Sequence, residues 1–291
     1  MSAARAEKGV GVLEPIGMIS TAHLFPGLHR HLMELLRGLA PTDWNRPTLA
    51  PAWTVREVVA HLLDGQVRRL SFQRDGLPMM PPEGPIKGYR DVVRFLNDLN
   101  ADWIRTTRRL SANVLMDFLE TTGPQVCELF ASLDPQGPSF FPVAWADESK
   151  SENWFDVGRE YTEWWHHQAQ IRDAVGAPAL TDREWLHPVL ALSMKAFPRA
   201  FKGVLAAPDT ALVLQITGEA GGTWSVIATR GGWSVLRGEK PDAAARARCS
   251  EDTAWKLFFN ALSEEEARER IVAEGDERLI EKLLSVRGVM V

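Results

Sequence analysis

Apolar residues recur with helical spacing along the chain as far as Val175, and shorter runs rich in β-branched residues follow. The helical segments share an apolar face and polar or proline-rich connections, and they cover Ile19–Leu39, Thr54–Leu70, Tyr89–Arg109, Ala112–Leu133 and Asp156–Val175. Amphipathic helices of this length bury their apolar faces against one another. The pattern therefore predicts an N-terminal four-helix bundle, in which the third and fourth segments are separate helices or one kinked helix.

Local signals set the ends of several of these helices. Pro26 suits an early helical turn, so the first helix is expected to begin near it. Thr54 and Glu57 have the spacing of a capping box, which starts the second helix. Gly176 is expected to stop the last one. The connection from Asp134 to Asn153 is rich in Pro, Ser, Gly and aromatic residues, and it predicts a long irregular loop of the kind that forms lids or cleft walls.

The C-terminal part of the chain carries segments of mixed type. A helix is expected from Asp182 to about Leu205. Three runs have the patterning of strands and are separated by glycine-rich turns, namely Ala211–Thr217, Gly222–Thr229 and Gly232–Arg237. Further helices are expected from Ser250 or Asp252 to Leu262, and over Glu264–Leu284. These elements predict a small α+β domain with an antiparallel sheet.

The change of pattern places a domain boundary near residue 180. We expect a loosely ordered N-terminal tail over residues 1–17, the helical bundle over 18–180, and the α+β domain over 181–291. The fold class expected is therefore α plus α+β.

Composition narrows the environment and the partners. The net charge is −5 and the sequence pI is near 5.9, so no bulk attraction to nucleic acid or to anionic lipid is expected. Residues 1–17 lack the apolar run of a signal peptide, and no stretch has the length of a membrane span. Cys127 and Cys249 have neither a Cys-x-x-Cys partner nor zinc-finger spacing. We therefore expect a cytoplasmic protein with reduced thiols, as a monomer or a homodimer.

Candidate chemistry is concentrated in Glu163-Trp-Trp-His166-His167 and in a distant His61. Glu163 and His167 are four residues apart, so they share one helix face, as helical metal ligands do. His61 lies among apolar residues, where an unpaired imidazole would be costly. Taken alone, His61 is more simply explained as a core histidine, and a surface Glu–His contact explains Glu163 and His167 as well as a metal site does. Glu163 with His166 has the spacing found in di-iron carboxylate bundles, but no second Glu-x-x-His occurs, which disfavours a dinuclear site.

A family resemblance decides between these alternatives. The segments from Asp43-Trp44 to Trp53-Thr54-Val55 and on to His61 resemble the signature of mycothiol-dependent maleylpyruvate isomerases and the wider DinB-like superfamily. The segment from Glu163 to Gly176 is similar to the second motif of that family. The resemblance implies a DinB-like bundle with a three-ligand metal site of His61, Glu163 and His167. It selects His167 over His166 as the ligand, because the family's helix closes with a Gly nine residues after the ligand His.

The C-terminal sequence resembles the sterol-carrier-like domain that often follows this bundle, through Gly222-x-Trp224, Pro241-Asp242-Ala243 and Gly275-Asp276. One departure is at Gln170, where family members commonly carry an Asp three residues after the ligand His. This departure leaves the substrate open and hardly affects the metal site. Asp64 and Gln170 each lie one helical turn from a ligand, so they are candidates to orient an imidazole, with solvent-exposed helix positions as the alternative.

Two imidazoles and one carboxylate suit zinc as the first expectation, with nickel or iron(II) as alternatives. The resemblance implies a small external thiol, mycothiol or bacillithiol, as the cofactor, and a small-molecule electrophile as the substrate. We therefore expect a metal-dependent enzyme that activates the thiol for isomerisation or S-transfer. A metal-dependent hydrolase that uses hydroxide and a non-catalytic metal- or ligand-binding protein are the alternatives.

Overall fold

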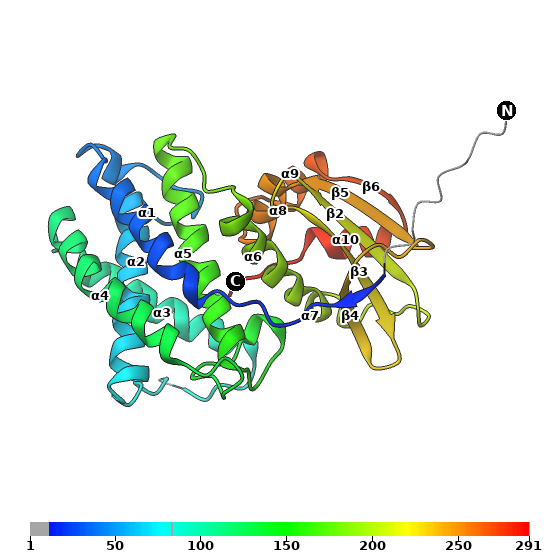
Figure 1. Cartoon of the computed structure of the whole chain (residues 1–291), viewed down its shortest axis with the longest axis horizontal. Helices are drawn as coiled ribbons and strands as arrows, with labels where there is room; N and C mark the ends of the chain where they lie inside the picture. The colour runs from blue at the N-terminus through cyan, green and yellow to red at the C-terminus, as the bar shows by residue number, and fades with distance from the viewer. Residues whose placement is uncertain (1–11, 83, 291) are drawn as a thin grey trace.

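The computed structural model describes residues 12–82 and 84–290 of the chain. A layer of five long helices lies on one side of the molecule and a β-sheet on the other, with α6 and α7 between them (Figure 1). The mixed α and β content agrees with the predicted fold class. The polar centre described below lies within the helical layer.

The helices of the first layer follow the predicted apolar pattern, and they are α1 Phe25–Arg37, α2 Val55–Arg68, α3 Tyr89–Thr107, α4 Ala112–Ser132 and α5 Asn153–Val175. Helix α2 contacts α3, α4 and α5, and α1 contacts α4 and α5. The third and fourth predicted segments are separate helices. Their shared core is apolar and includes Phe25, Phe130 and Tyr161, whose rings meet edge to face.

The predicted helix signals are confirmed. Pro26 occupies the first turn of α1. At the start of α2 the backbone N–H of Thr54 donates to Glu57 Oε2 at 3.0 Å, which completes the capping box. Gly176 adopts a left-handed conformation with φ of 68° after α5, a geometry that glycine reaches without a steric cost. The connection from Asp134 to the start of α5 at Asn153 is irregular, apart from a short 3₁₀ turn at Ala144–Ala146 and an isolated bridge between Pro138 and Glu152.

The sheet is mixed, so the prediction of an antiparallel sheet was wrong in part. Its strands are β1 Glu14–Pro15, β2 Ala211–Thr217, β3 Gly222–Thr229, β4 Gly232–Arg237, β5 Ala245–Ser250 and β6 Val272–Gly275, in the order β1-β4-β3-β2-β5-β6. Strands β2 and β5 pair in parallel, from Leu212 opposite Ala245 to Thr217 opposite Ser250. The other pairings are antiparallel.

Two of these strands fall where the sequence pattern was not recognised as β. Strand β5 alternates Ala245, Ala247 and Cys249, which are buried, with long arginines, and it contains no β-branched residue. Strand β6 lies within Glu264–Leu284, where one or two helices are predicted, and it separates α9 Glu264–Arg270 from α10 Glu277–Leu284. Only the pairing with neighbouring strands makes these short segments extended.

The predicted loose tail also needs correction. Residues 1–11 lie outside the described part of the chain. Within the remainder, Glu14–Pro15 form β1, which pairs with β4 and is the outer strand of the sheet, and Arg237 forms an ion pair with Glu14. A proline is tolerated there because an outer strand needs no further donor on its free side.

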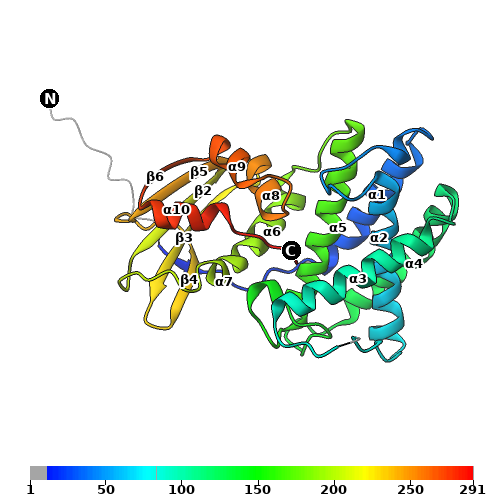
Figure 2. The same ribbon diagram turned by 180° about the vertical axis from the view of Figure 1, so that it is seen from behind.

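The C-terminal part packs back on the helical layer. Helix α6 Arg183–Ser193 contacts α5 and α8 Glu251–Phe258, and α7 Phe197–Ala200 contacts β4. After α10 the chain returns toward α3 and α5 (Figure 2), and the Tyr89 hydroxyl lies 3.5 Å from the carbonyl of Val289. Segments distant in sequence therefore meet between the two layers.

Two expectations about environment can be compared with the structure. Among the helices described, none combines the length and the apolar character that a membrane span requires. Cys127 and Cys249 are both buried and unpaired.

A buried ion cluster joins α2 to α5. Arg69, at the end of α2, is 1 % exposed and donates from its two terminal nitrogens to the two oxygens of Asp156 at 2.8 and 2.6 Å. It also donates to Glu160 at 3.0 Å, and Arg159 contacts both carboxylates. The ring of Phe141 covers the Arg69 guanidinium at 4.9 Å. Two cations and two anions thus neutralise one another inside the helical layer.

We predict that Asp156→Asn lowers the free energy of unfolding by about 3 kcal/mol at neutral pH, because it leaves Arg69 without its bidentate partner. Burial would raise the pKa of Asp156, but Arg159 and Arg69 lower it from 3.8 to about 2. The lowered pKa means that the stabilisation is complete above about pH 4 and is lost as the pH falls through 2. Denaturant unfolding at several pH values measures this.

Asp102→Asn is the matched control, because Asp102 and Arg105 form an exposed pair on α3. It should change the free energy of unfolding by less than about 0.5 kcal/mol. Equal effects of the two substitutions would contradict a stabilising role for the buried cluster.

Candidate metal centre

Helices α2 and α5 bring His61, Glu163 and His167 together. His61 lies in the second turn of α2, and Glu163 and His167 lie one turn apart on α5. One ligand atom from each residue lies within 4.8 Å of the other two, which is a spacing that a single metal ion can bridge. Helices α2 and α5 are far apart in the sequence but pack directly against each other, which brings His61 close to Glu163 and His167.

The three side chains face each other through specific atoms. Glu163 Oε2 lies 3.4 Å from His167 Nε2 and 4.0 Å from His61 Nε2. The His167 side chain is 7 % exposed, His61 14 % and Glu163 27 %. The cluster is therefore covered on the imidazole side and accessible at the carboxylate.

The protonation of these groups leaves ligand lone pairs available. Burial lowers the pKa of His61 from 6.5 to about 4, so its ring is neutral near pH 7. Burial would raise the pKa of Glu163, but the neighbouring His167 and His61 rings hold it well below 4.5. His167 Nδ1 lies 2.9 Å from Gln170 Oε1, and the donor and acceptor roles at this ring depend on its tautomer. In the tautomer that donates from Nδ1 to Gln170, Nε2 faces the Glu163 carboxylate with a lone pair that an ion can use.

The two residues predicted to orient the imidazoles have different surroundings. Gln170 contacts His167, as expected from its position one turn further along α5. Asp64 is buried and forms an ion pair with Arg68 Nη2 at 2.9 Å. Within the described part of the chain no hydrogen bond joins Asp64 to His61. The structure thus brings Gln170, but not Asp64, into contact with a ring of the cluster.

His166 is not part of the cluster of ligand atoms, and its ring lies beside that of His167, with the centroids 3.9 Å apart. Its Nδ1 lies 2.8 Å from the carbonyl oxygen of Thr162. Its ring stacks on Phe259, which follows α8, with centroids 4.4 Å apart and an interplanar angle of 19°. The stacking on Phe259 attaches the C-terminal part of the chain to the centre.

Trp53 is a site residue that the sequence reasoning did not assign. Its ring lies 4.7 Å from that of His61 and 6.0 Å from that of His167, measured between centroids. The indole therefore covers both imidazoles on one side and restricts their orientation. The available signal was its place directly before the capped start of α2, inside the motif that carries His61.

The donor set defines the possible chemistry. Two imidazole nitrogens and one carboxylate oxygen match divalent ions of borderline character. Three protein ligands leave coordination positions for water or a substrate, which is typical of catalytic rather than structural sites. The exposed edge of Glu163 gives a small molecule access to those positions.

We predict that His166 and Phe259 stabilise the fold as a pair. His166→Ala and Phe259→Ala should each lower the free energy of unfolding, and a double-mutant cycle should give a coupling of about 1 kcal/mol, because stacking is lost only once. A control cycle that combines His166→Ala with Phe140→Ala should give additive effects, because Phe140 is 40 % exposed. Additive effects for His166 and Phe259 would contradict the pairing.

Comparisons with known proteins concern the fold and the family. None of the curated proteins matches the chain. The solved structures that match include those of the mycothiol-dependent maleylpyruvate isomerase and of a histidine-to-alanine mutant of it. Both are 11 % identical and cover 88 % of this chain and 92 % of the other, with TM-scores of 0.53 for the isomerase and 0.52 for the mutant. At that identity the likeness establishes a shared fold.

The family model described as the mycothiol maleylpyruvate isomerase N-terminal domain matches residues 25–172. The matched segment includes α1 to α4 and most of α5, and so all three residues of the cluster. Because it spans more than half of the chain, the chain belongs to the mycothiol maleylpyruvate isomerase N-terminal domain family.

Proposed function

We propose that the protein is a metal-dependent enzyme that uses a small thiol, with His61, Glu163 and His167 as the metal ligands. The observation that carries the proposal is the convergence of their ligand atoms within 4.8 Å. The three residues lie inside the segment that matches the isomerase family model. A structural Glu–His contact is the alternative, and the location of all three residues inside the matched family segment favours the metal site.

A divalent ion in this position would supply Lewis acidity that lowers the pKa of a bound thiol or water. The ligand set favours zinc, with nickel or iron(II) as alternatives. Gln170 contacts Nδ1 of His167, and Trp53 limits rotation of both imidazoles. Glu163 contributes the negative charge and borders the open side.

The thiol is proposed to come from outside the chain. Burial raises the pKa of Cys127 to about 11 and that of Cys249 to about 12, so neither is a thiolate near pH 7. The description of the matched family model names mycothiol, a small thiol, together with maleylpyruvate isomerase. We infer a thiol of the mycothiol or bacillithiol type, which isomerises a small electrophilic substrate or is transferred to it.

The comparison with the isomerase family also supports an assignment of the bundle type. We infer that α1, α2, α4 and α5 form a bundle of the DinB-like type, with α3 beside α2. The likeness to the isomerase structures extends over 88 % of the chain, beyond the matched N-terminal domain. The sterol-carrier-like character of residues 181–291 and the boundary near residue 180 stay predictions. The cytoplasm suits both the two unpaired cysteines and a reduced thiol cofactor.

We predict that untagged protein purified without chelators contains one divalent ion per chain, measured by elemental mass spectrometry. His61→Ala and His167→Ala should each reduce the metal content at least tenfold. The two ligands that remain bind the ion too weakly for it to stay bound at the protein concentrations used in purification. His166→Ala should retain the metal, since this ring bonds Thr162 and stacks on Phe259. Circular dichroism verifies folding of each variant.

Loss of the metal in His166→Ala with retention in His167→Ala would overturn the ligand assignment. A metal-free wild-type protein that takes up no added zinc, nickel or iron(II) would overturn the enzyme proposal itself.

We predict that turnover of an electrophilic substrate depends saturably on mycothiol or bacillithiol and is lost in Glu163→Gln, which removes the anionic ligand. Cys127→Ser and Cys249→Ser should retain activity, because both thiols are buried and protonated. Product formation is followed by chromatography with and without the thiol. Turnover of esters or amides without any thiol would instead support the hydrolase alternative.

A further inference from the structure

A row of adjacent rings runs from the candidate metal centre into the C-terminal part of the chain. The ring of His167 lies 4.7 Å from that of His61 and 3.9 Å from that of His166, measured between centroids. His166 in turn lies 4.4 Å from Phe259, which directly follows α8. The row therefore connects two candidate metal ligands, on α2 and α5, with a residue that lies outside the helical layer.

The close approach of His166 to His167 is unusual for neighbouring residues of a helix. Consecutive side chains point roughly 100° apart around a helix axis, so they do not normally face each other. Here both rings are buried and each has a polar partner of its own, the carbonyl of Thr162 for His166 and the amide of Gln170 for His167. In such dense packing, a movement of one ring displaces the other.

Phe259 covers the ring of His166. The two rings are stacked with an interplanar angle of 19°, and Phe259 is itself buried. A flat contact of this kind restricts the rotation of both rings. His166 thus has His167 as one ring neighbour and Phe259 as another, and it transmits the position of Phe259 to His167.

Contacts within the C-terminal part determine where Phe259 lies. Its backbone N–H donates to the carbonyl of Trp255 at 3.0 Å, which continues the hydrogen bonding of α8. Asn260 then turns the chain in a left-handed conformation with φ of 56°, which asparagine adopts more readily than most residues. Arg287, after α10, donates from Nε to the side chain of Asn260 at 2.9 Å. These contacts fix Phe259 independently of the helical layer.

Two further contacts hold α8 against the helix that carries both histidines. The rings of Trp165 and Trp255 meet edge to face, with centroids 5.7 Å apart and an interplanar angle of 79°. Lys256 Nζ lies 3.8 Å from Asp173 Oδ1 near the end of α5. The stacking of Phe259 on His166 is therefore part of a docked interface between α8 and α5.

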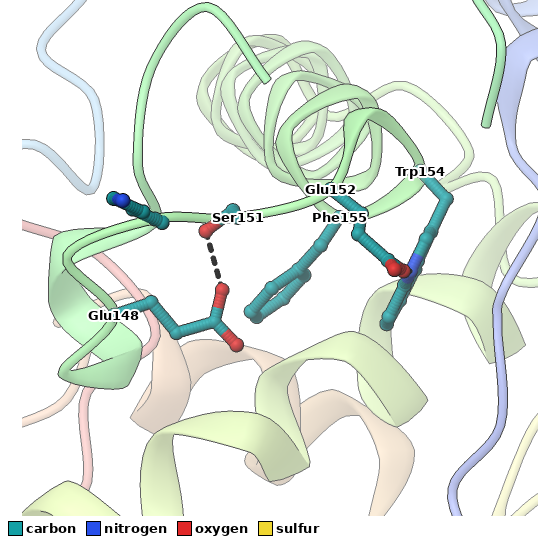
Figure 3. A pocket seen from close by; sticks show the side chains of 6 residues that line it. Glu148, Ser151, Glu152, Trp154 and Phe155 are labelled. Carbon is teal, nitrogen blue, oxygen red and sulfur yellow. Dashed lines mark hydrogen bonds between the residues drawn. The ribbon is translucent and has the colours of Figure 1, made fainter. Parts of the chain in front are cut away.

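A second stacked pair lines a surface hollow at the start of α5 (Figure 3). The rings of Trp154 and Phe155 have centroids 5.1 Å apart and an interplanar angle of 24°. Phe155 precedes Glu163 by roughly 12 Å along the helix axis. This pair offers a comparison, because it stacks on the same helix at a distance from the candidate ligands.

We infer that Phe259 is a positioning residue of the metal centre, which holds His166 in place so that His166 keeps the ring of His167 turned toward the ion. The inference rests on the proposed ligands His61, Glu163 and His167, and not on the thiol chemistry. It follows that tight metal binding requires the C-terminal part to be docked on α5. Because coupling between two sites is reciprocal, a bound ion in turn holds Phe259 against His166.

The test compares the zinc affinity of the full-length wild-type chain with that of Phe259→Leu, by competition with a chromophoric chelator. Leucine keeps an apolar side chain but removes the stacked ring. Zinc affinity should fall about tenfold, the lower end of the effect of losing a group that orients a metal ligand. The visible spectrum of the cobalt(II)-loaded protein, which depends on ligand geometry, should also change.

Two control substitutions remove an aromatic ring that does not contact His166. Phe258→Leu acts at the neighbouring position, where the buried ring packs on Phe197 with centroids 5.9 Å apart. Trp154→Leu removes the stacking partner of Phe155 on α5. Both should lower the melting temperature and leave the zinc affinity and the cobalt spectrum unchanged. An equal loss of zinc affinity in Phe258→Leu would overturn the inference, because general loss of packing would then explain the effect.

A double-mutant cycle tests whether His166 transmits the effect. His166→Ala should weaken zinc binding about as much as Phe259→Leu, and the double variant should lose no more than either alone. A site weakened tenfold still retains its ion when the dissociation constant is well below the protein concentration, so His166→Ala is still purified with metal. Additive losses of zinc affinity would overturn the role of His166.

The remaining outcomes separate this inference from the proposed ligand set. Unchanged zinc affinity and an unchanged cobalt spectrum in Phe259→Leu would overturn the inference and leave the ligands as assigned. A wild-type protein that binds neither zinc nor cobalt would overturn both. Circular dichroism shows whether each variant is folded, and Phe259→Met provides the same comparison should Phe259→Leu be unfolded.

Discussion

Helix α5 lies in the interior of the protein, although it carries carboxylates, imidazoles and amides along most of its length. Ionised and polar groups removed from water destabilise a fold unless each one finds a partner. The arginine at the end of α2 satisfies the acidic groups at the start of α5, and Gln168 donates to the carbonyl of Leu28 in α1. This requirement fixes how α1, α2 and α5 pack against one another.

The need to pair the buried polar groups of α5 also explains which groups remain at the candidate metal centre. Once His166 bonds Thr162 and Gln170 contacts His167, the carboxylate of Glu163 remains opposite the imidazoles of both helices. Among the ion pairs of residues 12–82 and 84–290, none joins an arginine to that carboxylate, whereas Asp156 and Glu160 earlier on α5 both pair with Arg69. Two adjacent polar clusters on one helix thus differ in kind, one closed by guanidinium groups and the other suited to an ion and a ligand.

The C-terminal part of the chain makes direct contacts with the helical layer. Phe259 covers His166 beside the centre, and the segment after α10 reaches Tyr89 at the start of α3. Both contacts need the helical layer and the sheet to be held together, which α6 and α7 achieve by packing between them.

Local signals in the sequence determined the helices and three of the strands, because periodicity, the Thr54 cap and the Gly176 stop act over a few residues. The i,i+4 spacing likewise placed Glu163 and His167 on one face. Family resemblance, not spacing, joined His61 to them. Only the tertiary structure decided the parallel β2–β5 pairing, the strand β6, the ring of Trp53 over the imidazoles and the partner of Asp64. Each of these depends on segments that meet in space, and short-range patterns carry no information about such contacts.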